Sequence, residues 1–144
     1  MKRIRAMLPL ALITCLMVFA FVGSDSNCGD RREDVLASVT IIDQPEGGTN
    51  VNTVSCTFEA SMTRTDGKTD VLEYPVRVNS IWHSSHGTYN APTLELYFPG
   101  QPQRHTVSKS APAGMHLDKP FWLEIFWYDK DGNNTIYSDT AYCE

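Results

Sequence analysis

Residues 54 to 63 read Val-Ser-Cys-Thr-Phe-Glu-Ala-Ser-Met-Thr, a stretch in which apolar and polar side chains strictly alternate. Successive side chains of a β-strand point to opposite faces, so one face of this segment is apolar and the other is polar. Alternation over this length is typical of a strand with one buried and one solvated face. The stretch therefore predicts a strand of an antiparallel sheet that covers a hydrophobic core.

The same alternation recurs, less strictly, along most of the remaining chain. Segments rich in Gly and Pro interrupt this alternation, and no window of a dozen residues beyond residue 24 shows the apolar stripe of a helix. Pro75 predicts that its strand is an edge strand or contains a bulge. Seven short strands with turns between them predict an all-β, two-sheet antiparallel sandwich. Besides the strand above, we expect strands at residues 35–43, 70–82, 93–98, 103–109, 121–128 and 135–142.

The last two strands flank a turn-forming segment. Residues 121–133 read Phe-Trp-Leu-Glu-Ile-Phe-Trp-Tyr-Asp-Lys-Asp-Gly-Asn, and together with the strand after them they predict a hairpin. This run resembles the last hairpin of immunoglobulin-like and fibronectin type III-like domains, where an alternating apolar strand ends in an Asp-x-Asp-Gly-Asn turn. The resemblance implies an immunoglobulin-like or fibronectin type III-like sandwich and does not indicate a function.

The N-terminal segment has the pattern of an export signal. Three basic residues within the first five precede a run from Ala6 to Gly23 that contains no charged residue. Small residues follow at the end of this run, where a signal peptidase needs them. We therefore expect a signal peptide at residues 1–24, a polar leader at 25–34 and the sandwich domain at 35–144. The protein would be secreted, periplasmic or part of the cell envelope.

Two alternatives to cleavage remain open. The uncharged run is long enough to act as a retained membrane anchor, with the domain on the outer side because the basic residues stay inside. Leu12-Ile13-Thr14-Cys15 is similar to a bacterial lipid-attachment motif. Either alternative gives a membrane-anchored protein whose only membrane contact is this N-terminal segment.

The charge of the mature chain excludes some partners. After removal of residues 1–24, nine Lys and Arg stand against seventeen Asp and Glu, a net charge of −8. Affinity for nucleic acids comes largely from basic side chains that release counterions, so we expect no nucleic-acid partner. An anionic membrane surface is disfavoured for the same reason.

Three cysteines, Cys28, Cys56 and Cys143, follow the predicted signal peptide, and an exported chain can form disulfides. In the sandwich that the resemblance implies, the start of the second strand and the end of the last strand lie at the same end. We therefore expect a Cys56–Cys143 disulfide, with Cys28 left as a free thiol, an intermolecular bridge or a lipid site. If Cys143 faces inward, alternation also turns Asp139 inward, so the last strand must bulge, twist or change partner.

Two groups of residues have incomplete metal-binding patterns. His83 and His86 are three residues apart, but zinc needs three or four ligands, and the other histidines, His105 and His116, are distant in sequence. We therefore expect residues 83–86 to form an exposed polar loop. Asp129, Asp131 and Asn133 match only the first oxygen positions of a calcium loop, so we expect a plain hairpin turn. No metal or other cofactor is predicted.

The strand at 121–128 carries aromatic residues on both faces. Phe121, Leu123, Ile125 and Trp127 suffice for its buried face, which leaves other aromatic side chains directed outward around Glu124. An exposed patch of this kind is typical of a protein or sugar contact. The alternative is that a loop such as Gly100 to Gly114 folds over this face and buries it. The candidate ligand-binding residues are Trp122, Phe126, Tyr128 and Tyr137.

Two classes of function follow from these patterns. The preferred one is an exported, non-catalytic binding or adhesion module that contacts a protein or glycan of the cell surface or envelope. The chain contains no Gly-x-Ser-x-Gly motif or other fixed nucleophile context, so we expect no enzyme and no catalytic residues. The alternative is a small secreted metal-binding protein or hydrolase built on the His83/His86 loop. Clustered histidines would favour this alternative, and an open aromatic face with dispersed histidines would favour the binding module.

Overall fold

The computed structural model describes residues 34–144. The predicted signal peptide, nearly all of the polar leader, Cys15 and Cys28 lie outside the described residues. Within 34–144 the chain forms eight β-strands and no helix. Accordingly, no helix in this range is long and apolar enough to cross a membrane.

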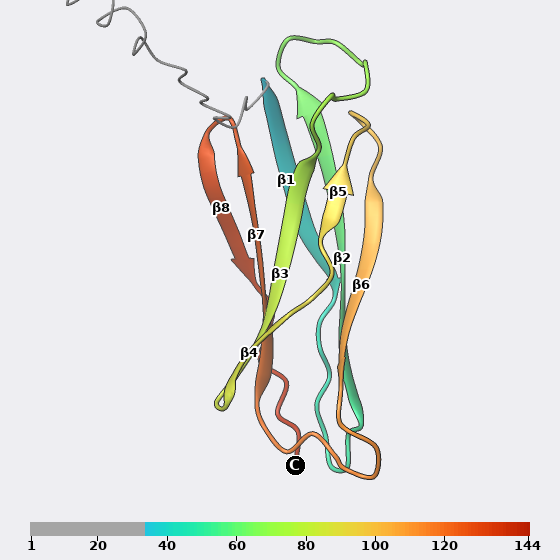
Figure 1. The fold of residues 1–144 in the computed structure, drawn as a ribbon, viewed down its shortest axis with the longest axis vertical. Helices are drawn as coiled ribbons and strands as arrows, with labels where there is room; N and C mark the ends of the chain where they lie inside the picture. The colour runs from blue at the N-terminus through green and yellow to red at the C-terminus, as the bar shows by residue number, and fades with distance from the viewer. Residues whose placement is uncertain (1–33) are drawn as a thin grey trace, which may run out of the picture. The chain divides into compact units, whose positions relative to one another are not determined.

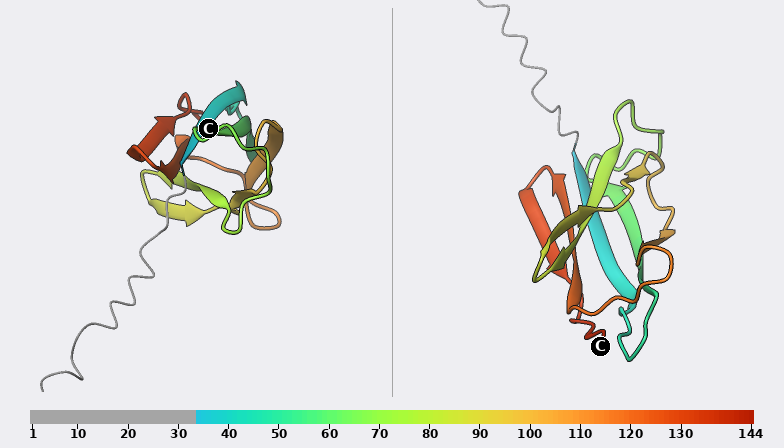
Figure 2. Two further views of the ribbon diagram at one scale, coloured as in Figure 1. Left: turned by 90° about the horizontal axis from the view of Figure 1, so that it is seen from above. Right: turned by 60° about the horizontal axis from the view of Figure 1, so that its bottom comes forward.

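The strands form two antiparallel sheets that face one another (Figures 1 and 2). The three-stranded sheet has the order β1-β2-β6, and the five-stranded sheet has the order β4-β3-β7-β8, with β5 also paired to β3. This arrangement confirms the predicted all-β antiparallel sandwich. The strands are β1 (Val35–Asp43), β2 (Thr53–Arg64), β3 (Val76–Ser84), β4 (Gly87–Asn90), β5 (Leu94–Leu96), β6 (Gln103–Ser110), β7 (Phe121–Asp129) and β8 (Gly132–Tyr137).

The alternating segment that predicted the fold is β2, the central strand of the three-stranded sheet. Its apolar residues are at most 1% exposed, and its other side chains face solvent or the sheet rim. Burial of one large apolar side chain stabilises a fold by about 1.5–3 kcal/mol, so this face is a main source of stability. The five buried residues are Val54, Cys56, Phe58, Ala60 and Met62.

Three of the predicted segments in the middle of the chain, two strands and one loop, need correction. The strand expected at 70–82 begins only at Val76, because Pro75 has no N–H to donate and restricts the residue before it. The strand expected at 93–98 is shortened to Leu94–Leu96. The exposed loop expected at 83–86 is a hairpin instead, in which Ser84 pairs with Gly87 and β4 follows. This strand was not predicted, since four residues are too few to show a period.

The C-terminal strand was expected at 135–142, but β8 spans Gly132–Tyr137. The β7–β8 turn is therefore shorter than predicted, since Asp129 already pairs with Gly132. Beyond Tyr137 the regular strand is interrupted, which agrees with the prediction that the last strand must bulge, twist or change partner before Cys143. Ala141 still pairs with β7, through an isolated bridge with Phe121, and the partner changes only at Cys143, which forms a parallel bridge with Gly48 in the β1–β2 loop.

The structure does not contain the predicted Cys56–Cys143 disulfide. Both cysteines are free thiols, and both are buried. The two cysteines do belong to the same end of the sandwich. However, the Gly48 N–H donates to the Tyr142 carbonyl (2.8 Å) and the Glu144 N–H donates to the Gly48 carbonyl (2.9 Å). This register holds Cys143 beside Gly48, whereas Cys56 pairs with Val107 of β6. The C-terminus is thus attached by backbone hydrogen bonds rather than by a disulfide.

Candidate functional site

The candidate site lies on the outer face of the five-stranded sheet, around β7. The inward set of β7 residues predicted from sequence is confirmed: Phe121, Leu123, Ile125 and Trp127 are at most 7% exposed. The intervening residues therefore point away from the core. They are Trp122, Glu124, Phe126 and Tyr128.

The flanking strands add residues to this outer face through their register. On β3, His83 lies opposite Trp122, Ile81 opposite Glu124 and Asn79 opposite Phe126. On β8, Tyr137 lies opposite Glu124. Directly opposed residues of an antiparallel pair share one face and contact each other. We call Trp122, Phe126, Tyr128 and Tyr137 the aromatic face.

The aromatic face is open to solvent on its β8 side. Tyr137 is 59% exposed and Tyr128 is 46% exposed, whereas Trp122 and Phe126 are half-buried. Phe126 packs edge-to-face on Tyr128, with ring centroids 6.4 Å apart. The alternative in which residues 100–114 cover this face is wrong, because most of that segment is β6, which belongs to the opposite sheet (Figure 1).

A hydrogen-bonded pair of polar side chains lies at the centre of this face. The Nε2 atom of His83 is 2.6 Å from the Oε2 atom of Glu124, and the side chains of both residues are about one quarter exposed. The His83 ring also stacks on the indole of Trp122, with centroids 5.4 Å apart and planes 10° from parallel. The carboxylate therefore orients the imidazole, and the imidazole supports one face of Trp122.

The border of the face on the β5 side is polar and largely paired. The Arg77 Nε atom contacts Glu95 Oε1 at 3.0 Å, and the Tyr97 hydroxyl donates to Glu95 Oε2 at 3.0 Å. This hydrogen bond to Glu95 is the main reason that the pKa of Tyr97 lies above its ordinary value. Tyr97 is thus held at the rim as a hydrogen-bond donor.

The four histidines have four different partners. His83 contacts Glu124, His86 contacts the Ser85 hydroxyl, His105 contacts the Pro92 carbonyl and His116 contacts Asn52. Within residues 34–144, no three His, Cys, Asp or Glu side chains are close enough to share a metal ion. His83 and His86 are therefore not brought together with a third ligand.

The second candidate metal site is the β7–β8 turn, which carries Asp129, Asp131 and Asn133. Asp129 is 5% exposed, and its Oδ1 accepts a hydrogen bond from the Asp131 N–H at 3.0 Å, so this carboxylate stabilises the turn. Asn133 lies opposite Tyr128 and is exposed on the outer face. The buried Asp129 carboxylate and the exposed Asn133 side chain thus do not share one face of the hairpin.

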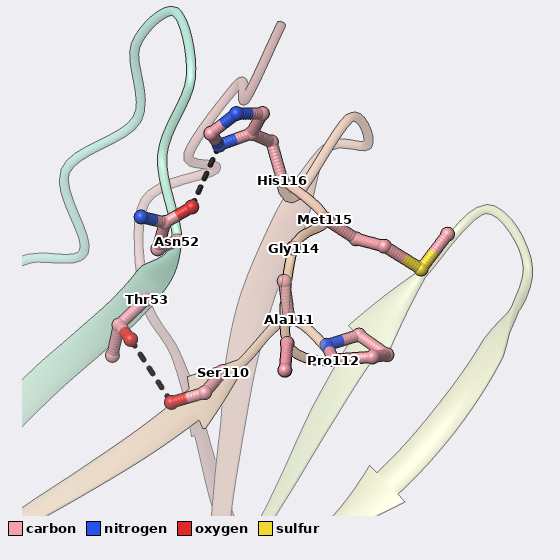
Figure 3. A pocket seen from close by; sticks show the side chains of 9 residues that line it. Asn52, Thr53, Ser110, Ala111, Pro112, Gly114, Met115 and His116 are labelled. Carbon is pink, nitrogen blue, oxygen red and sulfur yellow. Dashed lines mark hydrogen bonds between the residues drawn. The ribbon is translucent and has the colours of Figure 1, made fainter.

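A shallow hollow of about 340 Å³ lies at one end of the three-stranded sheet (Figure 3). The side chains of His116 and Asn52 point toward one another across it, with Nδ1 and Oδ1 2.6 Å apart. The hydroxyls of Thr53 and Ser110 form a second hydrogen bond of 2.9 Å. These four polar side chains form hydrogen bonds with each other in two pairs. The hollow therefore offers a ligand fewer unpaired hydrogen-bonding groups than the aromatic face does.

The pairing of His83 with Glu124 was missed at the sequence level. The two residues are 41 positions apart, and only the β3–β7 register brings them together. A signal was nevertheless present, because alternation along 76–84 places Asn79, Ile81 and His83 on one face and that face is opposite to the core residues Val78 and Trp82.

No protein-family model matches the chain, and neither does any curated protein. The crystal structure of MtrC from Shewanella baltica OS185 is similar at a TM-score of 0.31 and 11% sequence identity. The match covers 76% of this chain but only 22% of that one. A similarity of this size supports no conclusion about fold family or function.

Proposed function

We propose that this protein is an exported, non-catalytic binding or adhesion module, which contacts a protein or glycan of the cell surface or envelope. The observation that carries the proposal is the open aromatic face, with Tyr128 and Tyr137 about half exposed beside Trp122 and Phe126. Clusters of aromatic side chains on a solvent-facing sheet surface typically mark binding sites, because the exposure of apolar rings to water is unfavourable.

The strand order supports an immunoglobulin-like or fibronectin type III-like domain. Such domains have strands A, B and E in one sheet and strands C, F and G in the other. When β4 and β5 are set aside, β1, β2 and β6 correspond to A, B and E, and β3, β7 and β8 correspond to C, F and G. Strand β4 lies at the outer edge of β3, where such domains carry an additional strand. Folds of this kind serve many functions, so the argument for binding rests on the aromatic face.

The alternative function at the His83/His86 loop is less well supported. His83 is engaged by Glu124 and Trp122 on the outer face of β3, whereas His86 lies in the exposed β3–β4 turn and contacts Ser85. Dispersed histidines beside an open aromatic face are the arrangement expected of a binding module. The N-terminal export pattern supports a location in which such a module meets surface molecules.

The proposal is tested by retention on envelope fractions of the producing organism. The full chain, processed by its own host and labelled with a fluorophore, is mixed with purified envelopes and sedimented. We expect retention of the wild type and loss of retention in the double variant Trp122→Ala/Tyr137→Ala.

The control is Tyr74→Ala, because Tyr74 is 60% exposed, which matches Tyr137, but lies in the β2–β3 loop. This variant should behave as the wild type. Equal retention of all three proteins, or of none, would overturn the proposed function.

A further inference from the structure

We propose that the ligand of the aromatic face is a neutral glycan chain rather than a protein. This inference rests on the proposed function and specifies the partner of the same face. It follows from the composition of the centre of the face, the spacing of its rings and its charge.

The centre of the face is polar. Glu124 lies between the outward aromatic residues of β7, directly opposite Tyr137 and hydrogen-bonded to His83 at 2.6 Å. The cores of protein interfaces are depleted of charged residues, because a partner surface must remove water from them. A protein bound here would desolvate this carboxylate at the middle of the contact. A sugar would instead offer hydroxyl groups, which donate to carboxylates and accept from imidazoles.

Hydrogen-bonding capacity remains at this centre. Glu124 uses Oε2 for His83, and its Oε1 atom has no partner among residues 34–144. The Tyr137 hydroxyl likewise makes no hydrogen bond within that range and is exposed. Glu124 and Tyr137 are opposed residues of β7 and β8, so this pair supplies one acceptor and one donor. This pair suits the vicinal hydroxyls of a sugar ring.

The rings are placed to receive the apolar faces of sugars. Side chains two positions apart on a strand lie about 6.7 Å apart on one face, so Trp122 and Phe126 are separated by about 13 Å along β7. Tyr137 lies between these two levels on the neighbouring strand, opposite Glu124. The face thus alternates aromatic rings with polar groups over a length greater than one sugar ring. This spacing indicates a chain of sugars as the ligand.

The charge of the face favours a neutral chain. Within strands β3, β7 and β8, Arg77 is the one Lys or Arg residue, and its Nε is already paired with Glu95 at 3.0 Å. Lys130 lies outside these strands, in the β7–β8 turn. Glu124 adds negative charge at the centre, and the mature sequence carries a net charge of −8. An anionic polysaccharide would be repelled by this field. A neutral glycan avoids that repulsion and can still use Glu124 as an acceptor.

The test uses envelopes from which other binding partners have been removed. Envelope fractions are digested with proteinase K and extracted with chloroform and methanol, which leaves the polysaccharide. The full-length processed protein should still be retained, and soluble neutral probes should compete for it. The probes are a β-glucan, a mannan and a chitin hexamer, with polygalacturonate as the anionic comparison.

Three variants test whether the aromatic side chains and Glu124 bind the glycan. Trp122→Ala and Tyr137→Ala should each weaken retention on the treated envelopes by roughly tenfold or more, as truncation of a central aromatic contact does. Glu124→Gln keeps the shape of the side chain but removes its charge, and it should weaken neutral-glycan binding while leaving thermal unfolding nearly unchanged. Tyr74→Ala should match the wild type throughout.

Specific results would overturn the inference. Retention that disappears after proteinase K, while untreated envelopes still bind through the aromatic face, would identify a protein partner and leave the proposed function intact. Competition by polygalacturonate instead of the neutral probes would contradict the charge argument. If retention on treated envelopes is the same for Trp122→Ala, Tyr137→Ala and the wild type, the glycan site is not on this face.

Discussion

The imidazole of His83 and the indole of Trp122 stack across β3 and β7, with ring centroids 5.4 Å apart and planes 10° from parallel. Glu124 holds the imidazole in place through a hydrogen bond of 2.6 Å to its Nε2 atom. Trp122 is therefore supported on one side by a ring whose own orientation is determined by a second residue. A binding surface with rings oriented in advance loses less entropy when a ligand docks.

This support predicts the behaviour of the His83→Ala variant. Trp82 and Trp127 are at most 7% exposed, so Trp122 is the tryptophan of the described chain that a quencher reaches most easily. Removal of the imidazole should increase acrylamide quenching of the fluorescence and lower the free energy of unfolding by about 0.5–1.5 kcal/mol. The control Trp122→Phe should abolish the quenchable component. Unchanged quenching in His83→Ala would mean that the stack does not shield Trp122.

Gly47 is predicted to be necessary for attachment of the C-terminus. A Cβ atom at this position would lie 1.9 Å from the carbonyl oxygen of Tyr142, which is backbone and cannot rotate away. Gly47→Ala should therefore lower the free energy of unfolding by about 1–3 kcal/mol in urea denaturation. The matched experiment repeats the substitution in a chain that ends at residue 141. If the cost is the same in that truncated chain, the clash with Tyr142 is not its cause.

Ser138 should contribute to stability at the point where the chain leaves β8. Its hydroxyl accepts a hydrogen bond from the buried Leu123 N–H at 2.7 Å and donates to the Asp139 carbonyl at 2.8 Å. Ser138→Ala leaves the Leu123 N–H without this partner, at a cost of about 1–3 kcal/mol in guanidinium denaturation. Ser108→Ala, on the exposed face of β6, should change stability by no more than about 0.5 kcal/mol. Equal effects of the two variants would contradict this role.

The buried thiol of Cys56 predicts a loss of stability at high pH. Burial, with a smaller contribution from the negative charge of Asp43, raises the pKa of Cys56 from its ordinary value near 9 to about 11. As the pH rises from 9 to 11, the unfolded thiol loses its proton before the folded one does, so the unfolded state gains stability. The free energy of unfolding should fall by about 1–2 kcal/mol over this range.

The measurement compares urea denaturation of the wild type and Cys56→Ala at pH 8 and pH 10.5. Other groups also titrate in this range, so the difference between the two proteins is the quantity that reports on Cys56. The variant should lose less stability than the wild type between the two pH values. Parallel losses would show that Cys56 does not titrate as described.

Sequence patterns predicted the parts of the fold that depend on neighbouring residues. The bounds of β1 and the inward and outward sets of β7 agree with alternation, because each side chain's face follows from its position in the strand. The prediction was wrong where backbone chemistry interrupted the pattern, as at Pro75, or where a strand was too short to show a period, as in β4.

The amino-acid sequence by itself determined the strand period, the all-β class and the presence of outward aromatic residues on β7. Only the tertiary structure decided what those residues contact. The register of β3 and β8 against β7 places His83 beside Trp122 and Tyr137 beside Glu124, and residues so far apart in the chain leave no local signal of their pairing. The same reason explains the two cysteines. Their common end of the sandwich followed from the strand order that the resemblance implied, whereas the bridge of Cys143 with Gly48 and the two free thiols appear only in the tertiary structure.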